Sequence, residues 1–359
     1  MRNAWLALAV MLSAAPATAE EISTSDNWAV RDDRHVLVNS GISMPAKAGM
    51  VSLVKTEEFS NKGRGIDNVA QYASPDQAIA ATVYVYFPSF PDAGLTAYRT
   101  SQIIMQRFGP ETRLFSASLI DAGGEKAAAI RQLYENADGG TRATAAAFLR
   151  AGGWIVKLRV SGPMSRNTDI VATLDALIAS LRFEDRAKPT PAHLLEVSEC
   201  PIQNPRKAKP LKDKDSADAA LFGALAGPAV VAGIEGGEAP PIQPLTKVCV
   251  RERFSIGPSA FEVMQATDEG VAPTSVFTVI NDSGMILRAS PRLLGTGHTL
   301  LIHQIGQTET LGSYDRIPSG EQLRDILSGT DSKGGAVRSR TEFDPDGSTR
   351  INVSSDQLK

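Results

Sequence analysis

The 359-residue sequence predicts an α+β protein of two domains, each an antiparallel sheet with packed helices. Its first half reads as several strands, one helix, three antiparallel strands and a closing helix, an order that excludes a doubly wound parallel sheet. Asp138-Gly139 between two strand patterns is a hairpin signal. The closing helix is apolar on one side only, so it requires a sheet to cover.

The first 19 residues have the three parts of a secretory signal peptide. Arg2 supplies the positive start, and residues 5–14 form an apolar core too short to span a bilayer. Ala19 ends a small-x-small cleavage site, and Glu20 is the expected first mature residue. We therefore expect an exported protein, either periplasmic or secreted.

The composition is that of an ordinary globular protein. Removing Arg2 from 37 basic residues leaves 36, against 40 acidic ones, and hydrophobic residues make up 42% of the chain. This balance gives no reason to expect nucleic acid or an anionic membrane as a partner. The length fits about two domains: an N-terminal domain at 20–185, a linker at 186–198 and a C-terminal domain at 199–359.

The first half of the N-terminal domain is expected to be rich in strands. Strand patterns occupy residues 35–45, 50–59, 67–72 and 78–87. Both faces of the last of these are largely apolar, so it is predicted to be a central strand covered on both sides. A helix follows at 95–108 and ends at Gly109-Pro110.

The second half of this domain contains a meander and the closing helix. Strands are expected at 126–136, 141–150 and 154–160, with Lys157 and Arg159 on the polar face of the last one. In the helix, Asn167 or Thr168 is the expected N-cap. Its apolar stripe consists of Ile170, Val171, Leu174, Leu177, Ile178 and Leu181.

These segments resemble a known fold. The order of strands, helix and hairpins, closed by WIVKLRV and VATLDALIASLRF, is similar to the PsbP-like fold. The earlier segments SGISMP, DNVAQYAS and ATVYVYFP are similar to small exported bacterial proteins, and the likeness covers residues 26–183. The resemblance implies an antiparallel sheet flanked by helices. Proteins of this fold include photosystem accessory proteins and secreted or binding proteins, and no shared catalytic set carries over to this chain.

Two cysteines, Cys200 and Cys249, are the only ones in the chain. In an exported protein they most simply form one disulfide, with two unpaired buried thiols as the alternative. Between them lies an Ala/Gly/Pro-rich insert, 205–245. Its segment 219–234 is interpreted as a short packed helix, and alternatively as an arm that touches a membrane or partner.

The C-terminal domain is also expected to alternate strands with one helix. Strands are predicted at 248–256, 261–266, 275–280, 285–289, 299–305, 340–343 and 349–353. Residues 281–284 form a hairpin turn between two of these strands. Ser319 caps the predicted helix, which Gly329 ends.

Residues with catalytic or metal-binding potential are few. His298 and His303 are five apart on one expected strand, so they face opposite sides and do not suit one metal. Asp344 and Asp346 resemble part of a calcium loop, but a Pro-Asp-Gly turn explains them.

Two further patterns have both a functional and an ordinary structural explanation. Ser52-x-x-Lys55 matches a nucleophile motif, yet the segment looks extended, which separates the two side chains. A second pattern is a set of cations that gathers into an anion-binding groove or forms an ordinary polar sheet face. Its members are Arg142, Arg150, Lys157 and Arg159, with Tyr84 or Tyr86 beside them.

The sequence therefore favours an exported, non-enzymatic envelope protein that binds an unknown envelope protein or small ligand. No catalytic, cofactor-binding or metal residue is assigned, and no cofactor is expected. A hydrolase whose site is assembled from distant residues is one alternative. A membrane-associated accessory protein that uses segment 219–234 is the other.

Overall fold

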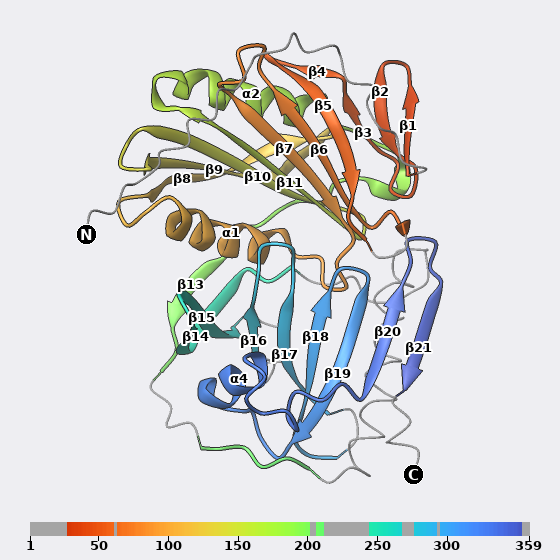
Figure 1. Cartoon of the computed structure of the whole chain (residues 1–359). Coiled ribbons are helices and arrows are strands. Elements are labelled where there is room, and N and C mark those ends of the chain that lie inside the picture. Colours follow the sequence, from red (N-terminus) through yellow and green to blue (C-terminus); the bar gives the residue numbers. More distant parts are fainter. Residues whose placement is uncertain are drawn as a thin grey trace, which may run out of the picture.

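A computed structural model describes residues 27–60, 63–201, 206–211, 244–267, 276–292 and 295–353. Within them the chain is mostly β, with three sheets and three α-helices (Figure 1). The predicted signal peptide with its Ala19–Glu20 cleavage site lies outside the described residues, and so does segment 219–234.

A small four-stranded sheet begins the described chain. It has the order β1 (Trp28–Arg31), β2 (Arg34–Leu37), β3 (Ile42–Pro45) and β12 (Arg182–Phe183). Strand β12 follows the second helix and pairs with β3, so chain ends of the N-terminal half meet in one sheet. The sequence patterns did not predict that these strands leave the main sheet.

The central layer is an eight-stranded sheet in which every neighbouring pair is antiparallel. The order is β4 (Lys47–Ala48), β5 (Val51–Glu58), β6 (Asp67–Ala73), β7 (Ala80–Tyr86), β11 (Trp154–Pro163), β10 (Arg142–Ala151), β9 (Glu125–Ala137) and β8 (Arg113–Ala122). Strand β7 is internal, as predicted. Edge strand β8 was not predicted.

Helix α2 (Asn167–Ser180) covers one face of this sheet. Five of the six predicted stripe residues are buried, while Val171 is half-buried and Thr173 is buried in its place. The capping prediction was wrong. A 3₁₀ turn (Met164–Arg166) winds directly into the helix, so Asn167 already has helical dihedrals and the side chain at the cap, Arg166, accepts no bond.

Helix α1 (Ala93–Arg107) covers the opposite face and starts two residues earlier than predicted. Asp92 is its N-cap and accepts a hydrogen bond from the Leu95 amide at 2.8 Å. Ala97 and Ile104 pack on the eight-stranded sheet, whereas Leu95 belongs to a cluster of the third sheet. The helix is therefore buried on two sides, between the two large sheets (Figure 1).

The third sheet has nine strands. Only β13 and β14 are parallel, and the other neighbours are antiparallel. The order is β13 (Glu196–Glu199), β14 (Lys247–Ile256), β15 (Ser259–Ala266), β16 (Val276–Val279), β17 (Ile286–Pro291), β18 (His298–Gln304), β19 (Gln307–Tyr314), β20 (Ser339–Phe343) and β21 (Thr349–Val353). Helix α4 (Gly320–Leu327) has the predicted Ser319 cap, and its Leu323 and Ile326 join the core of this sheet.

A disulfide joins Cys200, directly after β13, to Cys249 in β14, with 4.8 Å between the Cα atoms. The segment before it, the predicted linker 186–198, is held against the eight-stranded sheet. The Thr190 amide donates to the Arg150 carbonyl at 3.0 Å, and the Ala192 amide donates to the Ala127 carbonyl at 2.8 Å. This segment therefore has defined hydrogen-bond partners, and its last residues form β13.

Candidate functional site

Polar side chains from distant parts of the chain meet between the two large sheets. We define the inter-sheet interface as the contacts that residues 63–195 make with residues 244–353. Helix α1, strand β11 and the loop after β7 contribute from one side. Turns and strands β14–β20 contribute from the other.

Arg99 of α1 is buried in this interface. Its guanidinium donates to the Ile280 carbonyl from Nε at 3.3 Å and from Nη2 at 3.1 Å, and to the Ala260 carbonyl at 3.0 Å. The same group lies 4.8 Å from the centre of the Phe261 ring. Burial lowers the pKa of Arg99, yet an arginine remains charged at neutral pH. Arg99 thus links α1 to the third sheet through two backbone carbonyl groups, one near the start of β15 and one just after β16.

The side chains of Tyr98 and Gln102, which flank Arg99 on α1, converge on Glu262 of β15. Tyr98 Oη donates to Glu262 Oε2 at 2.5 Å, and Gln102 Nε2 donates to the same oxygen at 2.9 Å. Arg253 Nε donates to the other carboxylate oxygen at 3.2 Å. Burial and the neighbouring carboxylate raise the pKa of Tyr98, so its hydroxyl stays a donor.

Lys157 of β11 points at the turn between β16 and β17. Its Nζ lies 2.8 Å from Asp282 Oδ2 and 3.1 Å from the Asp282 carbonyl oxygen. The Tyr86 hydroxyl donates to that carbonyl at 3.3 Å, and the Tyr84 ring centre is 4.6 Å from Nζ. Burial lowers the Lys157 pKa below its ordinary value, and the Asp282 carboxylate opposes this shift only in part.

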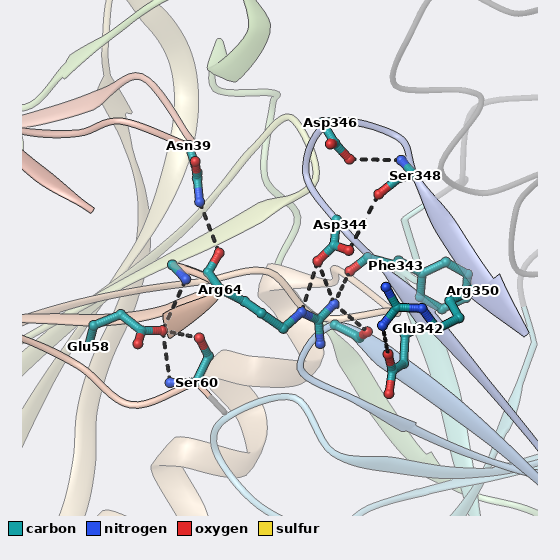
Figure 2. A network of polar contacts seen from close by, with 12 residues as sticks. Asn39, Glu58, Ser60, Arg64, Glu342, Phe343, Asp344, Asp346, Ser348 and Arg350 are labelled. Atoms are coloured by element: carbon teal, nitrogen blue, oxygen red, sulfur yellow. Dashed lines mark hydrogen bonds and ion pairs between the residues drawn. The ribbon is translucent and has the colours of Figure 1, made fainter. Parts of the chain in front are cut away.

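Arg64 forms the contact at the far end of the interface (Figure 2). Its Nε donates to Asp344 Oδ1 at 2.8 Å, and its Nη2 donates to the Phe343 carbonyl at 2.6 Å. On its own side, the Arg64 carbonyl accepts a hydrogen bond from Asn39 Nδ2 at 2.9 Å. Gly306 (φ +60°) lies against this arginine, and a Cβ there would overlap Ile66 Cδ1. The two sheets thus approach closely here.

The loop after β7 brings a serine beside a histidine. Ser89 Oγ lies 3.3 Å from Nδ1 of His303, and Thr308 Oγ1 lies 3.2 Å from the same nitrogen. Nε2 of His303 is buried and has no hydrogen-bond partner among the described residues. Burial and the positive charge of Arg288 lower the His303 pKa to about 3. The imidazole is therefore neutral over the ordinary pH range.

Asp92 fixes the start of α1 to the third sheet. Besides the Leu95 amide, it accepts a hydrogen bond from the Leu245 amide at 3.2 Å. Burial raises its pKa, while these amide donors oppose that shift. One carboxylate thus satisfies backbone groups on both sides of the inter-sheet interface.

The structure separates most of the predicted candidate residues. Ser52 and Lys55 lie exposed on β5, where Lys55 pairs with Glu57 at 3.1 Å. His298 is half-buried at the start of β18, five residues from His303. Asp346 accepts a hydrogen bond from the Ser348 amide at 2.9 Å, as a turn residue does.

The four cations considered for a groove do not gather at one place. Arg142 and Arg150 are at opposite ends of β10, about 27 Å apart at 3.4 Å per residue. Arg142 lies 3.9 Å from Asp138, and Arg150 Nε donates to the Gly152 carbonyl at 3.0 Å. Lys157 lies beside Tyr84 as considered, but its charge is directed at Asp282.

Sequence reasoning missed the most densely bonded members, Arg99 and Glu262. The one available signal was that Leu95 and Tyr98, both large side chains, lie on a different side of the helix from Ala97 and Ile104 at helical spacing. In the described part of the chain, no group of three or more His, Cys, Asp or Glu residues could hold a metal ion. None of the described helices is long and apolar enough to cross a membrane.

No protein-family model matches the chain, and none of the curated proteins compared with it matches either. Among solved structures, cyanobacterial PsbP from Synechocystis sp. PCC 6803 matches 42% of this chain and 91% of its own, at 14% identity and a TM-score of 0.31. This match is the resemblance to the PsbP-like fold that the sequence predicted. A crystal structure from Bacteroides thetaiotaomicron matches 55% of this chain and 62% of its own, at 13% identity and a TM-score of 0.21.

Proposed function

We propose that this chain is an exported protein of the cell envelope that works by binding another protein, with its two large sheets held as one rigid body. The observation that carries the proposal is the inter-sheet interface. Its ionic groups are occupied in joining the sheets: Lys157 with Asp282, and Arg64 with Asp344. A surface composed of both sheets is thereby preorganised, which lowers the entropic cost of binding.

Two features support export. The first 19 residues have the pattern of a secretory signal peptide. The two cysteines of the chain form a disulfide, a bond that persists in oxidising compartments and is rare in the cytosol. Fractionation of cells that express the full chain tests this part, since export predicts a periplasmic or secreted product shortened by 19 residues.

Crosslinking in the envelope, followed by reciprocal pull-down of the identified partner, tests the binding function. The mature chain is used beside two variants. Asp282→Ala removes the partner of Lys157, whereas Asp185→Ala removes an exposed carboxylate outside the interface. We expect the partner to bind the parent and Asp185→Ala equally, and Asp282→Ala more weakly, because only part of its population keeps the competent sheet arrangement.

The absence of any specific crosslink in the envelope would overturn the binding function. Equal binding by all three chains, with Asp282→Ala shown to have lost inter-sheet coupling, would remove the requirement for a rigid body. These two results are separable, because the second still identifies a partner.

A hydrolase is the second candidate, because Ser89 lies beside His303. In a Ser-His mechanism the imidazole takes the serine proton and a carboxylate orients the ring. Here the His303 pKa is lowered to about 3, and Nδ1 faces two hydroxyls. Binding is therefore favoured. Hydrolysis of a small activated ester that the Ser89→Ala variant loses and the parent retains would reverse this preference.

Membrane association through segment 219–234 is a third possibility that the sequence raised. That segment lies outside the described residues. Deleting residues 219–234 tests this function. If the segment attaches the protein to the membrane, the shortened protein should leave the membrane fraction.

A further inference from the structure

Strand β8 is a long edge strand with an apolar exposed surface. Among the described residues it pairs only with β9, so its other side is an edge of the eight-stranded sheet there. Phe115 is 68% exposed, and Leu114 and Leu119 are exposed as well. The seven residues between Arg113 and Asp121 carry no charge. An edge of this kind is a ready template for pairing with another strand.

The edges of the nine-stranded sheet have a different composition. Edge strand β13 has the sequence EVSE, with two glutamates in four residues. Edge strand β21 has Arg350 as its second residue and is fully exposed. Charged side chains of this kind discourage edge-to-edge pairing. Strand β8 carries its charges only near its two ends, and those charges are opposite in sign.

The sequence of β8 is complementary to itself when it is reversed about Ala117. In an antiparallel pair of two such strands, Ala117 faces Ala117, and Ser116 faces Ser118. Phe115 then faces Leu119, an aromatic–aliphatic pair on the exposed face. Such cross-strand pairs stabilise a sheet. Both Phe115–Leu119 pairs form at once, because the arrangement has two-fold symmetry.

The ends of the strand lie outside this match. Leu114 pairs beside Tyr134 and Ile120 beside Ala129, which lie in the clusters on opposite faces of the sheet, so the match is confined to residues 115–119. A bulge between Leu114 and Ser116 leaves the pairing with β9 regular from Ser116 to Ile120. The centre of the match, from Ser116 to Leu119, lies in this regular part, and Phe115 is at the bulge itself.

We propose that β8 pairs antiparallel with β8 of a second copy of this chain, centred on Ala117. The pairing joins two eight-stranded sheets into one continuous sheet and removes both free edges. The same surface is used on both copies, as in a closed two-fold dimer. The other occupant that an edge strand accepts is an extended segment of a different protein, and the experiment below distinguishes the two. The inference does not rest on the proposed function, because a second copy is bound whether or not an envelope partner exists.

The purified mature chain, with its disulfide intact, is compared with two variants by sedimentation velocity over a range of concentrations. Ala117→Lys places two positive charges face to face on the symmetry axis while it alters an exposed side chain. Val30→Lys adds the same charge to exposed edge strand β1 of the small sheet. We expect a parent dimer, an Ala117→Lys monomer with unchanged circular dichroism, and a Val30→Lys dimer.

Single cysteines then test the register and do not depend on the lysine variant's folding. Residues directly opposite in an antiparallel pair have Cα atoms about 4.5–5.5 Å apart, within disulfide range. Ala117→Cys should therefore form a covalent dimer on a non-reducing gel. Leu119→Cys alone should not, because the two Leu119 positions are four residues, or about 13 Å, out of register. The Phe115→Cys/Leu119→Cys double variant should crosslink again.

A parent chain that remains a monomer at every concentration overturns the proposal. The proposal also fails if the Ala117→Lys variant is still a dimer, or if Ala117→Cys forms no crosslink. Either result places the dimer contact elsewhere. A dimer that shows the predicted crosslinks supports it.

Discussion

The ion pair between Lys157 and Asp282 should couple the stability of the two large sheets. Asp282→Ala leaves the Lys157 ammonium, whose side chain is 8% exposed, without its carboxylate. Removing one partner of a buried pair costs about 3–5 kcal/mol. Asp282 is 37% exposed, and its carbonyl oxygen still accepts a bond from Nζ at 3.1 Å. Water and this remaining bond reduce the expected loss to about 2–3 kcal/mol.

A double-mutant cycle separates the pair from its parts. Lys157→Met fills the buried site with an apolar chain and leaves Asp282 partly hydrated, so we expect a loss of about 1 kcal/mol. Adding Asp282→Ala to Lys157→Met should then cost little, because the uncompensated charge is gone. The coupling energy is expected to be about 2 kcal/mol, within the range of residues that interact directly.

Urea unfolding measured by two probes provides the assay. The mature chain keeps Trp28 and Trp154, which both lie on the N-terminal side of the inter-sheet interface, so tryptophan fluorescence reports that side. Far-ultraviolet circular dichroism reports all sheets. We expect coincident transitions for the parent and separated transitions for Asp282→Ala. If Asp282→Ala stays within about 0.5 kcal/mol of the parent and its two transitions coincide, the interface does not couple the sheets as argued.

Three further outcomes are expected. The His303 pKa is about 3 in the fold against 6.5 normally. The unfolded chain therefore binds the extra proton between these values, and His303 should make stability fall as pH falls from 6.5 to 3. His303→Gln should abolish about 2 kcal/mol of the loss between pH 5.5 and 4.0, measured by urea unfolding at each pH; an unchanged slope contradicts this. Cys200→Ser opens a loop closed over a separation of 49 residues and should cost roughly 4 kcal/mol, a loss that reducing the parent must reproduce. Leu174→Ala should cost about 2–5 kcal/mol in thermal or urea unfolding, with Val171→Ala, at a half-buried site, as the milder control.

Local periodicity was sufficient to predict the elements whose burial is decided by their own sheet. Trp154, Val156 and Leu158 alternate in the sequence and lie in one core cluster. The stripe of α2 follows the same logic at helical spacing. These patterns can be read from the sequence because each element buries one of its faces in a single apolar core.

Two of the strands that escaped prediction, β8 and β19, did so for opposite reasons. In β8 the bulge after Leu114 interrupts the two-residue period, so Phe115 and Leu119 do not read as one strand face with Leu114. In β19 the buried positions are largely polar, and Thr308 and Thr310 lack the apolar signature of a core strand. In both cases the strand is defined by its neighbour in the sheet.

The interface residues illustrate what a sequence cannot encode locally. Asp282 was correctly placed in a turn, but nothing near it in the chain indicates Lys157, which lies 125 residues away. Arg99 reaches the Ile280 carbonyl across 181 residues. A backbone carbonyl has no residue type, so its role as an acceptor becomes visible only when the tertiary structure brings the arginine to it.

Because helix α1 belongs to two cores, the order of synthesis matters for this chain. Leu95 emerges from the ribosome about 150 residues before Leu245, Val248 and Val250, the side chains that enclose it. Until then the side of α1 that carries Leu95 is an exposed apolar surface, which chaperones and proteases can bind. Truncations that stop short of β15 should consequently be degraded or sequestered, even though every strand of the eight-stranded sheet is already present.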